Sequence, residues 1–169
     1  MKRLILMVVL TAVVAMTGCI KIRYTTSGAS IPAEATTFSV SYFQNNAQLA
    51  QPALSQKITD AIIDKISSQT RLKLTNGIGD LHFEGEVVGY DTRPEAIQAN
   101  ETAAMNRLTI TINVRFQNSI DPDKDFETRF SRFQKYSSSE SLANVENNLI
   151  DLINAELVED IFNRALVNW

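Results

Sequence analysis

Hydrophobic and polar residues alternate without interruption along one segment of the chain. From 108 to 117, apolar side chains occupy every even position and polar side chains occupy every odd position. Alternation with a period of two is typical of a β-strand that buries one face and exposes the other. The segment therefore predicts a strand whose odd positions form a polar face outside the core. These odd positions are Thr109, Thr111, Asn113, Arg115 and Gln117.

Less regular alternation predicts further strands on both sides of this one. These segments are 37–43, 72–74, 81–90 and 126–136. In the first segment, Phe38, Val40 and Tyr42 are expected to face the core. The segment 72–74 is the weakest of the four. Between 91 and 105 the chain is polar and has no pattern of its own, so we expect a long loop there.

Two other segments repeat their apolar residues every three or four positions, which predicts amphipathic helices. The first follows Pro52, and its apolar stripe consists of Leu54, Ile58, Ala61, Ile62 and Ile66. The second follows Ser137 to Glu140, whose spacing predicts a capping box. Its expected buried side consists of Val145, Leu149, Leu152, Ile153, Leu157, Ile161 and Ala165. One-sided strands and two such helices predict an α+β fold: a two-layer sandwich of a four-stranded, antiparallel-rich sheet with both helices packed on one face.

The first nineteen residues have the order of a secretory signal peptide. Two basic residues precede an apolar run over 4–16. A helix of about thirteen residues is roughly 20 Å long, which is shorter than the ~30 Å hydrocarbon core of a membrane, so we expect cleavage. Met16-Thr17-Gly18-Cys19 resembles the lipobox of bacterial lipoproteins, and its cysteine is the only one in the chain. The predicted division is a signal peptide over 1–18, a lipidated tether over 19–36 and a single domain over 37–169.

A lipid on Cys19 determines where the domain is expected to lie. Two or three acyl chains on one cysteine anchor a protein stably, whereas one chain binds only marginally. In known bacterial lipoproteins, a residue other than Asp after the cysteine favours export to the outer membrane, and here that residue is Ile20. We therefore expect an outer-membrane lipoprotein with its body on the periplasmic side.

Charge and residue types exclude several classes of chemistry. A formal net charge of −3 disfavours a general nucleic-acid binder, which needs a positive field. The chain has one histidine, His82, and its single thiol is assigned to the lipid, so a Cys-His nucleophile and an ordinary zinc site lack ligands. The alternating aspartates over 121–125 resemble the start of a calcium loop, but Phe126 replaces the required Gly and Arg132 the required Glu. We predict no catalytic residue, no metal and no cofactor.

Two charged groups leave alternatives open. Glu84 and Glu86 share one strand face about 6.6 Å apart, at ~3.3 Å per residue. Paired carboxylates can hydrolyse glycosides, so a lipid-anchored hydrolase stands beside the interpretation of a charged solvent face. Arg107, Arg115 and Arg129 are candidates for an anion-binding strip, because a guanidinium binds phosphate through two parallel hydrogen bonds. Here the alternative is a set of solvated arginines.

Several stretches of the sequence together carry a resemblance to a known family. They are Thr37-Phe-Ser-Val-Ser-Tyr-Phe, Ser67-Ser-Gln-Thr, Gly79-Asp-Leu-His-Phe-Glu-Gly-Glu, Glu101-Thr-Ala-Ala-Met-Asn-Arg-Leu-Thr-Ile-Thr, Asp125-Phe-Glu, Leu157-Val-Glu-Asp-Ile-Phe-Asn and Asn168-Trp169. In this order they resemble the short form of the LptE family, the lipoproteins of lipopolysaccharide assembly at the outer membrane. The resemblance implies a two-helix, four-stranded domain seated as a plug inside its partner, the LptD barrel, where it helps deliver lipopolysaccharide outward.

The polar strand face and the polar loop are the surfaces we expect to meet such a partner. The candidate contact residues are Gln98, Thr109, Thr111, Asn113 and Gln117. Polar side chains suit the polar interior of a large outer-membrane barrel. The alternative is a lipid-anchored periplasmic adaptor of another envelope complex.

Overall fold

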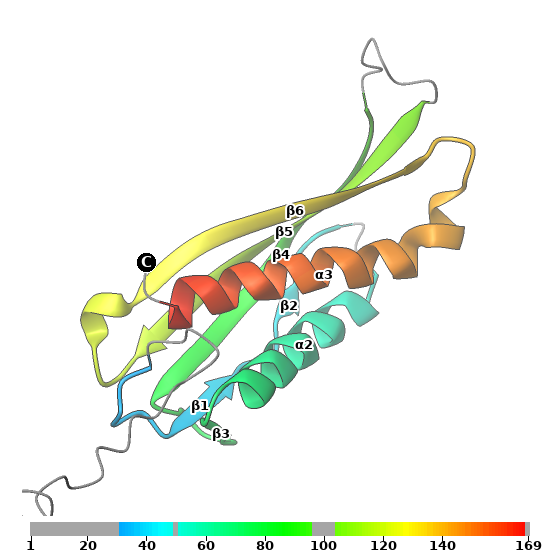
Figure 1. Cartoon of the computed structure of the whole chain (residues 1–169). Coiled ribbons are helices and arrows are strands. Elements are labelled where there is room, and N and C mark those ends of the chain that lie inside the picture. Colours follow the sequence, from blue (N-terminus) through cyan, green and yellow to red (C-terminus); the bar gives the residue numbers. More distant parts are fainter. Residues whose placement is uncertain (1–30, 49–50, 96–103, 168–169) are drawn as a thin grey trace, which may run out of the picture.

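Three long strands and two helices make up most of the described part of the chain (Figure 1). The computed structural model describes residues 31–48, 51–95 and 104–167. The elements, in chain order, are β1 (Thr37–Val40), β2 (Gln44–Asn45), α2 (Ala53–Gln69), β3 (Lys73–Leu74), β4 (Leu81–Pro94), β5 (Met105–Asn118), the 3-10 turn η1 (Pro122–Lys124), β6 (Phe126–Ser137) and α3 (Leu142–Leu166).

The sheet is mixed and has six strands, so the α+β class is confirmed but the four-stranded, antiparallel-rich sheet is wrong. Its order is β3-β1-β4-β5-β6, and β2 pairs with β4 beyond the end of β1. The strands β4, β5 and β6 are antiparallel, whereas β1 runs parallel to both β3 and β4. The parallel pairs arise because α2 lies between β1 and β3 and returns the chain to the same end of the sheet.

The predicted first strand over 37–43 ends early. Phe38 is fully buried, but Tyr42 is 54% exposed and the neighbouring Phe43 is 0% exposed, so the expected orientation of Tyr42 is wrong. After Val40 the backbone leaves the ladder, and pairing with β4 resumes only at β2. The Phe43 ring then fills the core above Gly85, where an added Cβ would lie 2.5 Å from the ring.

The strands β4 and β5 are longer than predicted, and part of the expected 91–105 loop belongs to them. Pairing continues to Pro94 and Asn106, and β5 begins at Met105. Asp91 to Pro94 are exposed, and the segment is polar because it extends beyond the helices. An irregularity between Val87 and Gly89 shifts the register, so that Tyr90 still faces the core.

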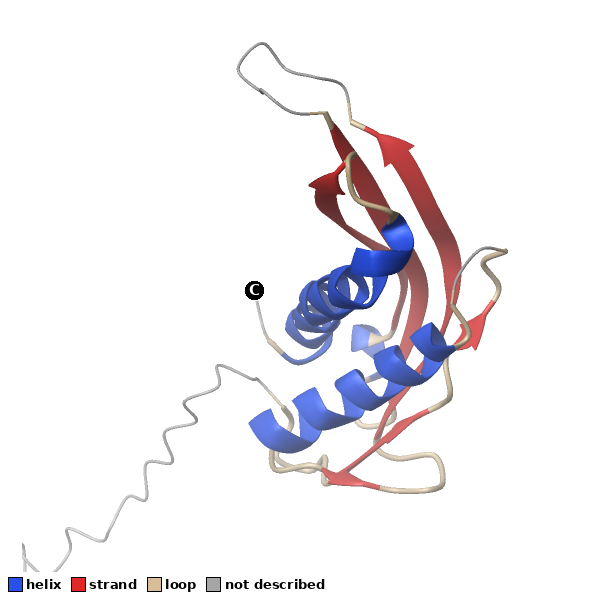
Figure 2. Cartoon of the chain, turned by 90° about the vertical axis from the view of Figure 1, so that its right-hand side faces the viewer, coloured by secondary structure: helices blue, strands red, loops and turns tan. Residues whose placement is uncertain are grey.

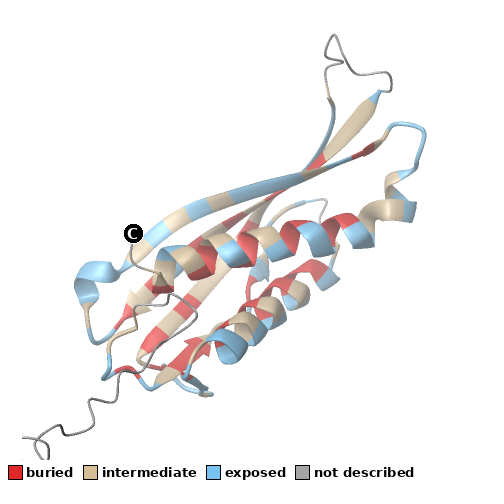
Figure 3. Ribbon diagram, in the orientation of Figure 1, coloured by how far each residue is buried: buried red, intermediate tan, exposed pale blue. Residues whose placement is uncertain are grey.

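Both helices cover the same face of the sheet, as predicted (Figure 2). The α2 residues Leu54, Ile58, Ile62 and Ile66 are buried, and so are the even positions of β5 (Figure 3). On α3, Leu152 is 46% exposed and its predicted burial is wrong. The helix instead buries two adjacent stripes, because it packs against α2 as well as the sheet. They consist of Leu149, Ile153, Leu157 and Ile161, and of Ile150, Asn154, Val158 and Phe162.

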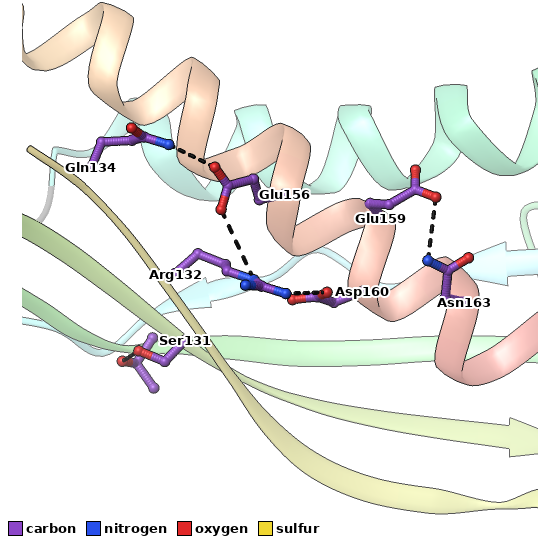
Figure 4. A network of polar contacts seen from close by, with 8 residues as sticks. Ser131, Arg132, Gln134, Glu156, Glu159, Asp160 and Asn163 are labelled. Atoms are coloured by element: carbon purple, nitrogen blue, oxygen red, sulfur yellow. Dashed lines mark hydrogen bonds and ion pairs between the residues drawn. The ribbon is translucent and has the colours of Figure 1, made fainter.

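Polar contacts bind α3 to the edge strand β6 (Figure 4). The guanidinium of Arg132 donates two hydrogen bonds to Asp160, both 2.6 Å long. The Gln134 amide donates to Glu156 over 2.6 Å. These even positions of β6 face the helix, whereas Ser131 points to the other side of the sheet.

The ends of the domain differ from prediction in two places. The N-cap of α3 is Ser141, without a side-chain capping bond, so the capping box at Ser137 to Glu140 is wrong. Ala35 is fully buried in the core, so the packed part of the chain begins before Thr37. Within the described ranges, neither helix has the length and apolar character needed to cross a membrane.

Candidate functional site

The outer face of the sheet, meaning the face turned away from α2 and α3, is the surface that this fold leaves uncovered (Figure 2). Its centre is the odd-numbered side of β5, because the even-numbered side is buried under the helices. The sequence placed five residues there, and the register agrees with that placement. They are Thr109, Thr111, Asn113, Arg115 and Gln117. Of these, Arg115 is exposed and the other four are half-buried.

Short polar side chains on this outer face bond to one another across the strands. Thr111 and Ser131 share a hydroxyl hydrogen bond of 2.9 Å. The Asn113 amide donates to Glu127 over 3.0 Å. Such pairs satisfy part of the hydrogen-bonding capacity of the outer face, while the remaining lone pairs and N–H groups stay available to a partner.

Arg115 lies between two carboxylates. Glu84 on β4 and Glu127 on β6 are its neighbours across the sheet, and its Nη1 lies 3.2 Å from Glu84 Oε1. Arg129 faces Asn113 and is therefore diagonal to Arg115. Among the described residues, Arg129 forms no ion pair within 4.0 Å. Positive charge at this end of the outer face is thus interleaved with negative charge.

Arg107 belongs to a second cluster, at the end of the sheet where β4 ends and β5 begins, which we call the distal end. It is eight residues from Arg115, or about 26 Å along the strand, so the three candidate arginines do not form one strip. The guanidinium lies 5.0 Å from the centroid of the Phe133 ring, and Glu95 forms ion pairs with both Arg107, at 3.6 Å, and Lys135, at 3.5 Å. Arg93 lies across from Arg107 in the strand register and pairs with Asp91 at 3.7 Å, so the cluster contains three cations and two carboxylates.

The distal cluster has the chemistry of an anion site. Within the described chain, the Arg107 Nε is buried and has no hydrogen-bond acceptor, although Glu95 lies nearby. A guanidinium and an ammonium side by side can bind phosphate or carboxylate groups.

Glu84 and Glu86 lie on the outer face but do not converge on a shared substrate position. Glu84 pairs with Arg115, and Glu86 accepts a hydrogen bond from the Asn46 amide. Both border a shallow hollow of about 440 Å³ on the outer face, together with Tyr42. Each carboxylate therefore has its own partner, which favours the interpretation of a charged surface over that of a catalytic pair.

His82 is largely enclosed by β1 and the residue that follows it. Its side chain is 12% exposed, with Nδ1 2.7 Å from Ser39 Oγ and Nε2 3.3 Å from Ser41 Oγ. The Gly79 N–H also donates to Ser39 Oγ over 2.9 Å. These bonds join β1 to β4. Sequence reasoning missed them because they depend on the parallel pairing of two distant segments.

Other predicted features are structural or outside the described residues. Asp125 accepts from the Asn118 N–H over 2.7 Å and Asp121 pairs with Lys124, so this acidic segment is a turn, as expected. In the part of the chain that the structure describes, no group of three or more acidic, His or Cys side chains could hold a metal ion. Cys19 and Gln98 both lie outside the described residues.

Comparisons with known proteins identify the family and support the fold. A family model described as LptE, lipopolysaccharide-assembly, matches residues 35–165. The fold is similar to that of lipoprotein B from Nitrosomonas europaea, at 16% identity and a TM-score of 0.50, over 85% of this chain and 88% of that one. A hypothetical protein from Chlamydia trachomatis also has a TM-score of 0.50, at 9% identity, over 77% of this chain and 95% of that one. A search of curated proteins found no match.

Proposed function

The chain belongs to the LptE family of lipopolysaccharide-assembly proteins, and we propose that it acts as a lipid-anchored plug of an outer-membrane barrel. The lipid is carried by Cys19 after removal of residues 1–18, and it holds the protein in the outer membrane. The domain sits in the lumen of an LptD-like translocon on the periplasmic side, where it assists the passage of lipopolysaccharide to the cell surface.

The uncovered outer face of the sheet is the observation that carries this proposal. Both helices bury their apolar residues on the opposite face, so the core is closed without a partner. The centre of the outer face combines uncharged polar side chains, the threonines with Asn113 and Gln117, with Arg115, whose charge is paired with Glu84. Such a surface suits a water-lined lumen, because an apolar surface promotes aggregation before assembly and a strongly charged one is costly to desolvate.

We assign the partner contacts to the residues that the sequence pointed to. These are Thr109, Thr111, Asn113 and Gln117 on β5, with Gln98 from the segment that joins β4 to β5. For lipopolysaccharide, whose phosphate groups are anionic, the candidate contacts are Arg107, Arg115 and Arg129. Arg107 is the strongest of the three, because Lys135 lies opposite it and its Nε has no hydrogen-bond acceptor within the described chain, whereas Arg115 already donates a hydrogen bond to Glu84.

Site-specific photo-crosslinking in cells tests the barrel contact. Crosslinkers at Asn113 and Gln117 should trap the barrel protein, because both side chains project from the outer face. Matched controls at Asn147 on α3 and Gln69 on α2 replace the same residue types at exposed helix positions. We expect strong products at the two strand positions and weaker products at the two helix positions.

The outcomes distinguish the plug from the alternative adaptor. Products with a barrel protein at the strand positions support the plug. Products with another envelope protein at the same positions support the adaptor, and the plug proposal is then wrong. If only the helix positions crosslink the barrel protein, the partner contacts the helical side of the molecule, and the assignment to the outer face of the sheet is wrong.

Intact-mass measurement of the membrane-extracted protein tests the anchor separately. The expected mass is that of a chain beginning at Cys19 with a diacylglyceryl thioether and its further acyl group. Replacement of Cys19 by Ala should abolish both the added mass and flotation with membranes. A wild-type chain that begins elsewhere and carries no lipid contradicts the proposed anchor.

A further inference from the structure

Two large apolar side chains are exposed close together at the β3 edge of the sheet. Ile78 is 86% exposed and Leu74 is 48% exposed. Both border one hollow of about 600 Å³, together with Ile63 of α2. Arg71 and Lys73, in the same short segment, are exposed as well. We call residues 71–78 the basal segment; it presents apolar and basic groups on a chain whose net charge is −3.

Asp80 ties the basal segment to the beginning of the described chain. Its Oδ2 accepts hydrogen bonds from the backbone N–H groups of Thr36 and Thr37, at 2.8 Å and 3.0 Å. Lys73 N–H donates to the Thr36 carbonyl over 3.0 Å, and Arg71 Nη2 donates to the Pro32 carbonyl over 2.6 Å. The segment 32–37, which leads into β1, therefore lies against the basal segment, at the lower end of the molecule in Figure 1.

The length of chain between this point and Cys19 limits where the anchor can be. Ile31 follows Cys19 by twelve residues, which span at most about 40 Å and roughly 20 Å as a flexible coil. The fourteen-residue strand β5 alone is about 46 Å long at ~3.3 Å per residue. The distal end of the sheet is thus much farther from the anchor than the basal segment is.

We propose that the basal segment rests on the lipid surface beside the anchor. The inference builds on the proposed lipid at Cys19 and adds a second membrane contact. Ile78 and Leu74 enter the boundary between headgroups and acyl chains, and Lys73 and Arg71 lie at the level of the anionic headgroup phosphates. The contact keeps the basal segment at the periplasmic mouth of the barrel, so that the sheet extends from there into the lumen and the Arg107 end lies farthest from the anchor.

Fluorescence in reconstituted vesicles tests this contact on the full lipidated protein. Because lipid blocks the Cys19 sulfur, a cysteine introduced by Ile78→Cys is the only reactive thiol and can carry an environment-sensitive fluorophore. In phosphatidylethanolamine and phosphatidylglycerol vesicles, nitroxide lipids should quench this label by roughly half, since such contacts lie within about 10 Å of the acyl boundary. The matched control is Thr92→Cys, an exposed position near the far end of β4.

A second variant set separates insertion from simple proximity to the bilayer. With the fluorophore placed by Asn76→Cys, quenching should persist in Ile78→Leu and fall severalfold in Ile78→Asp. Both changes are at a side chain outside the core, so the melting temperature should not change. Lys73→Gln should reduce quenching in vesicles with phosphatidylglycerol but not in neutral ones, because its attraction to anionic lipid is electrostatic.

Failure of the contact and failure of the anchor give different results. A protein that floats with vesicles but shows equal, weak quenching at positions 78 and 92 overturns the lipid contact and leaves the anchor intact. A protein that does not float refutes the anchor itself. Shielding at position 78 only after co-reconstitution with a barrel protein assigns the segment to a protein partner and also overturns the inference.

Discussion

The hydroxyl of Thr59 accepts a hydrogen bond from the backbone N–H of Phe43, which has no acceptor in the sheet. Where the backbone leaves the ladder between β1 and β2, the Phe43 N–H donates to Thr59 Oγ1 over 3.1 Å. The same hydroxyl donates to the Ser55 carbonyl of α2 over 2.8 Å. Thr59 is 6% exposed and Phe43 is 0% exposed, so water has little access to this bond. Thr59→Val should therefore leave a buried N–H group without an acceptor.

The expected loss follows from this missing acceptor rather than from packing. Valine has nearly the shape of threonine, so the cavity term is small, whereas an unsatisfied buried donor costs about 1–3 kcal/mol. We expect the free energy of unfolding to fall by about 2 kcal/mol, which lowers the melting temperature by roughly 6 °C in a domain of this size. Thr59→Ser keeps the hydroxyl and removes one methyl group, which costs about 0.8 kcal/mol.

The relative stability of the two variants shows whether hydrogen bonding or packing controls the contribution of Thr59. Thermal and urea unfolding followed by circular dichroism should place Thr59→Val below Thr59→Ser in stability. Hydrogen exchange of the Phe43 amide should accelerate in the valine variant and change little in the serine variant. If serine is the more destabilising replacement, packing controls the site and the hydrogen-bond argument is wrong.

Three further predictions test other contacts. Gly85→Ala should cost about 2 kcal/mol in urea unfolding, since its Cβ would overlap the Phe43 ring and a backbone oxygen, both at 2.5 Å. Hydrogen bonds from two backbone N–H groups lower the pKa of Asp80 from 3.8 to about 2, so its stabilisation is present above pH 4 and lost towards pH 2. In Asp80→Asn, the urea midpoint should be lower at pH 7 and should fall less between pH 4 and pH 2. Replacing Glu84 and Glu86 by Gln should leave growth and envelope integrity unchanged in complementation, whereas loss with the fold and partner binding intact would revive the hydrolase alternative.

The sequence alone determined the elements whose patterns are set by one buried face. The alternation over 108–117 predicted β5 and the side of it that stays outside the core. The apolar stripe of α2 was also predictable, because this helix buries one side, with Leu54, Ile58, Ile62 and Ile66. The candidate contacts on β5 followed from the same period of two, which assigns odd positions to one face whatever the neighbours are.

Tertiary structure decided whatever depends on neighbours distant in the chain. Only the register places Glu84 and Glu127 on either side of Arg115, and only the length of β5 separates Arg107 from that group. On α3, Leu152 is exposed and Phe162 is buried, which is the reverse of what a single apolar stripe predicts. The reason is that α3 packs against both α2 and the sheet.

The break in strand pairing after Val40 shows that the burial of strand residues also depends on neighbours distant in the chain. Local alternation favours Tyr42 in the core, but the cavity above Gly85 accepts the ring of Phe43 and Thr59 accepts its N–H group. Both partners lie on other elements, so the local pattern carries no trace of them. A sequence pattern specifies which face of a segment is apolar, whereas the packing of the whole domain specifies where that face ends.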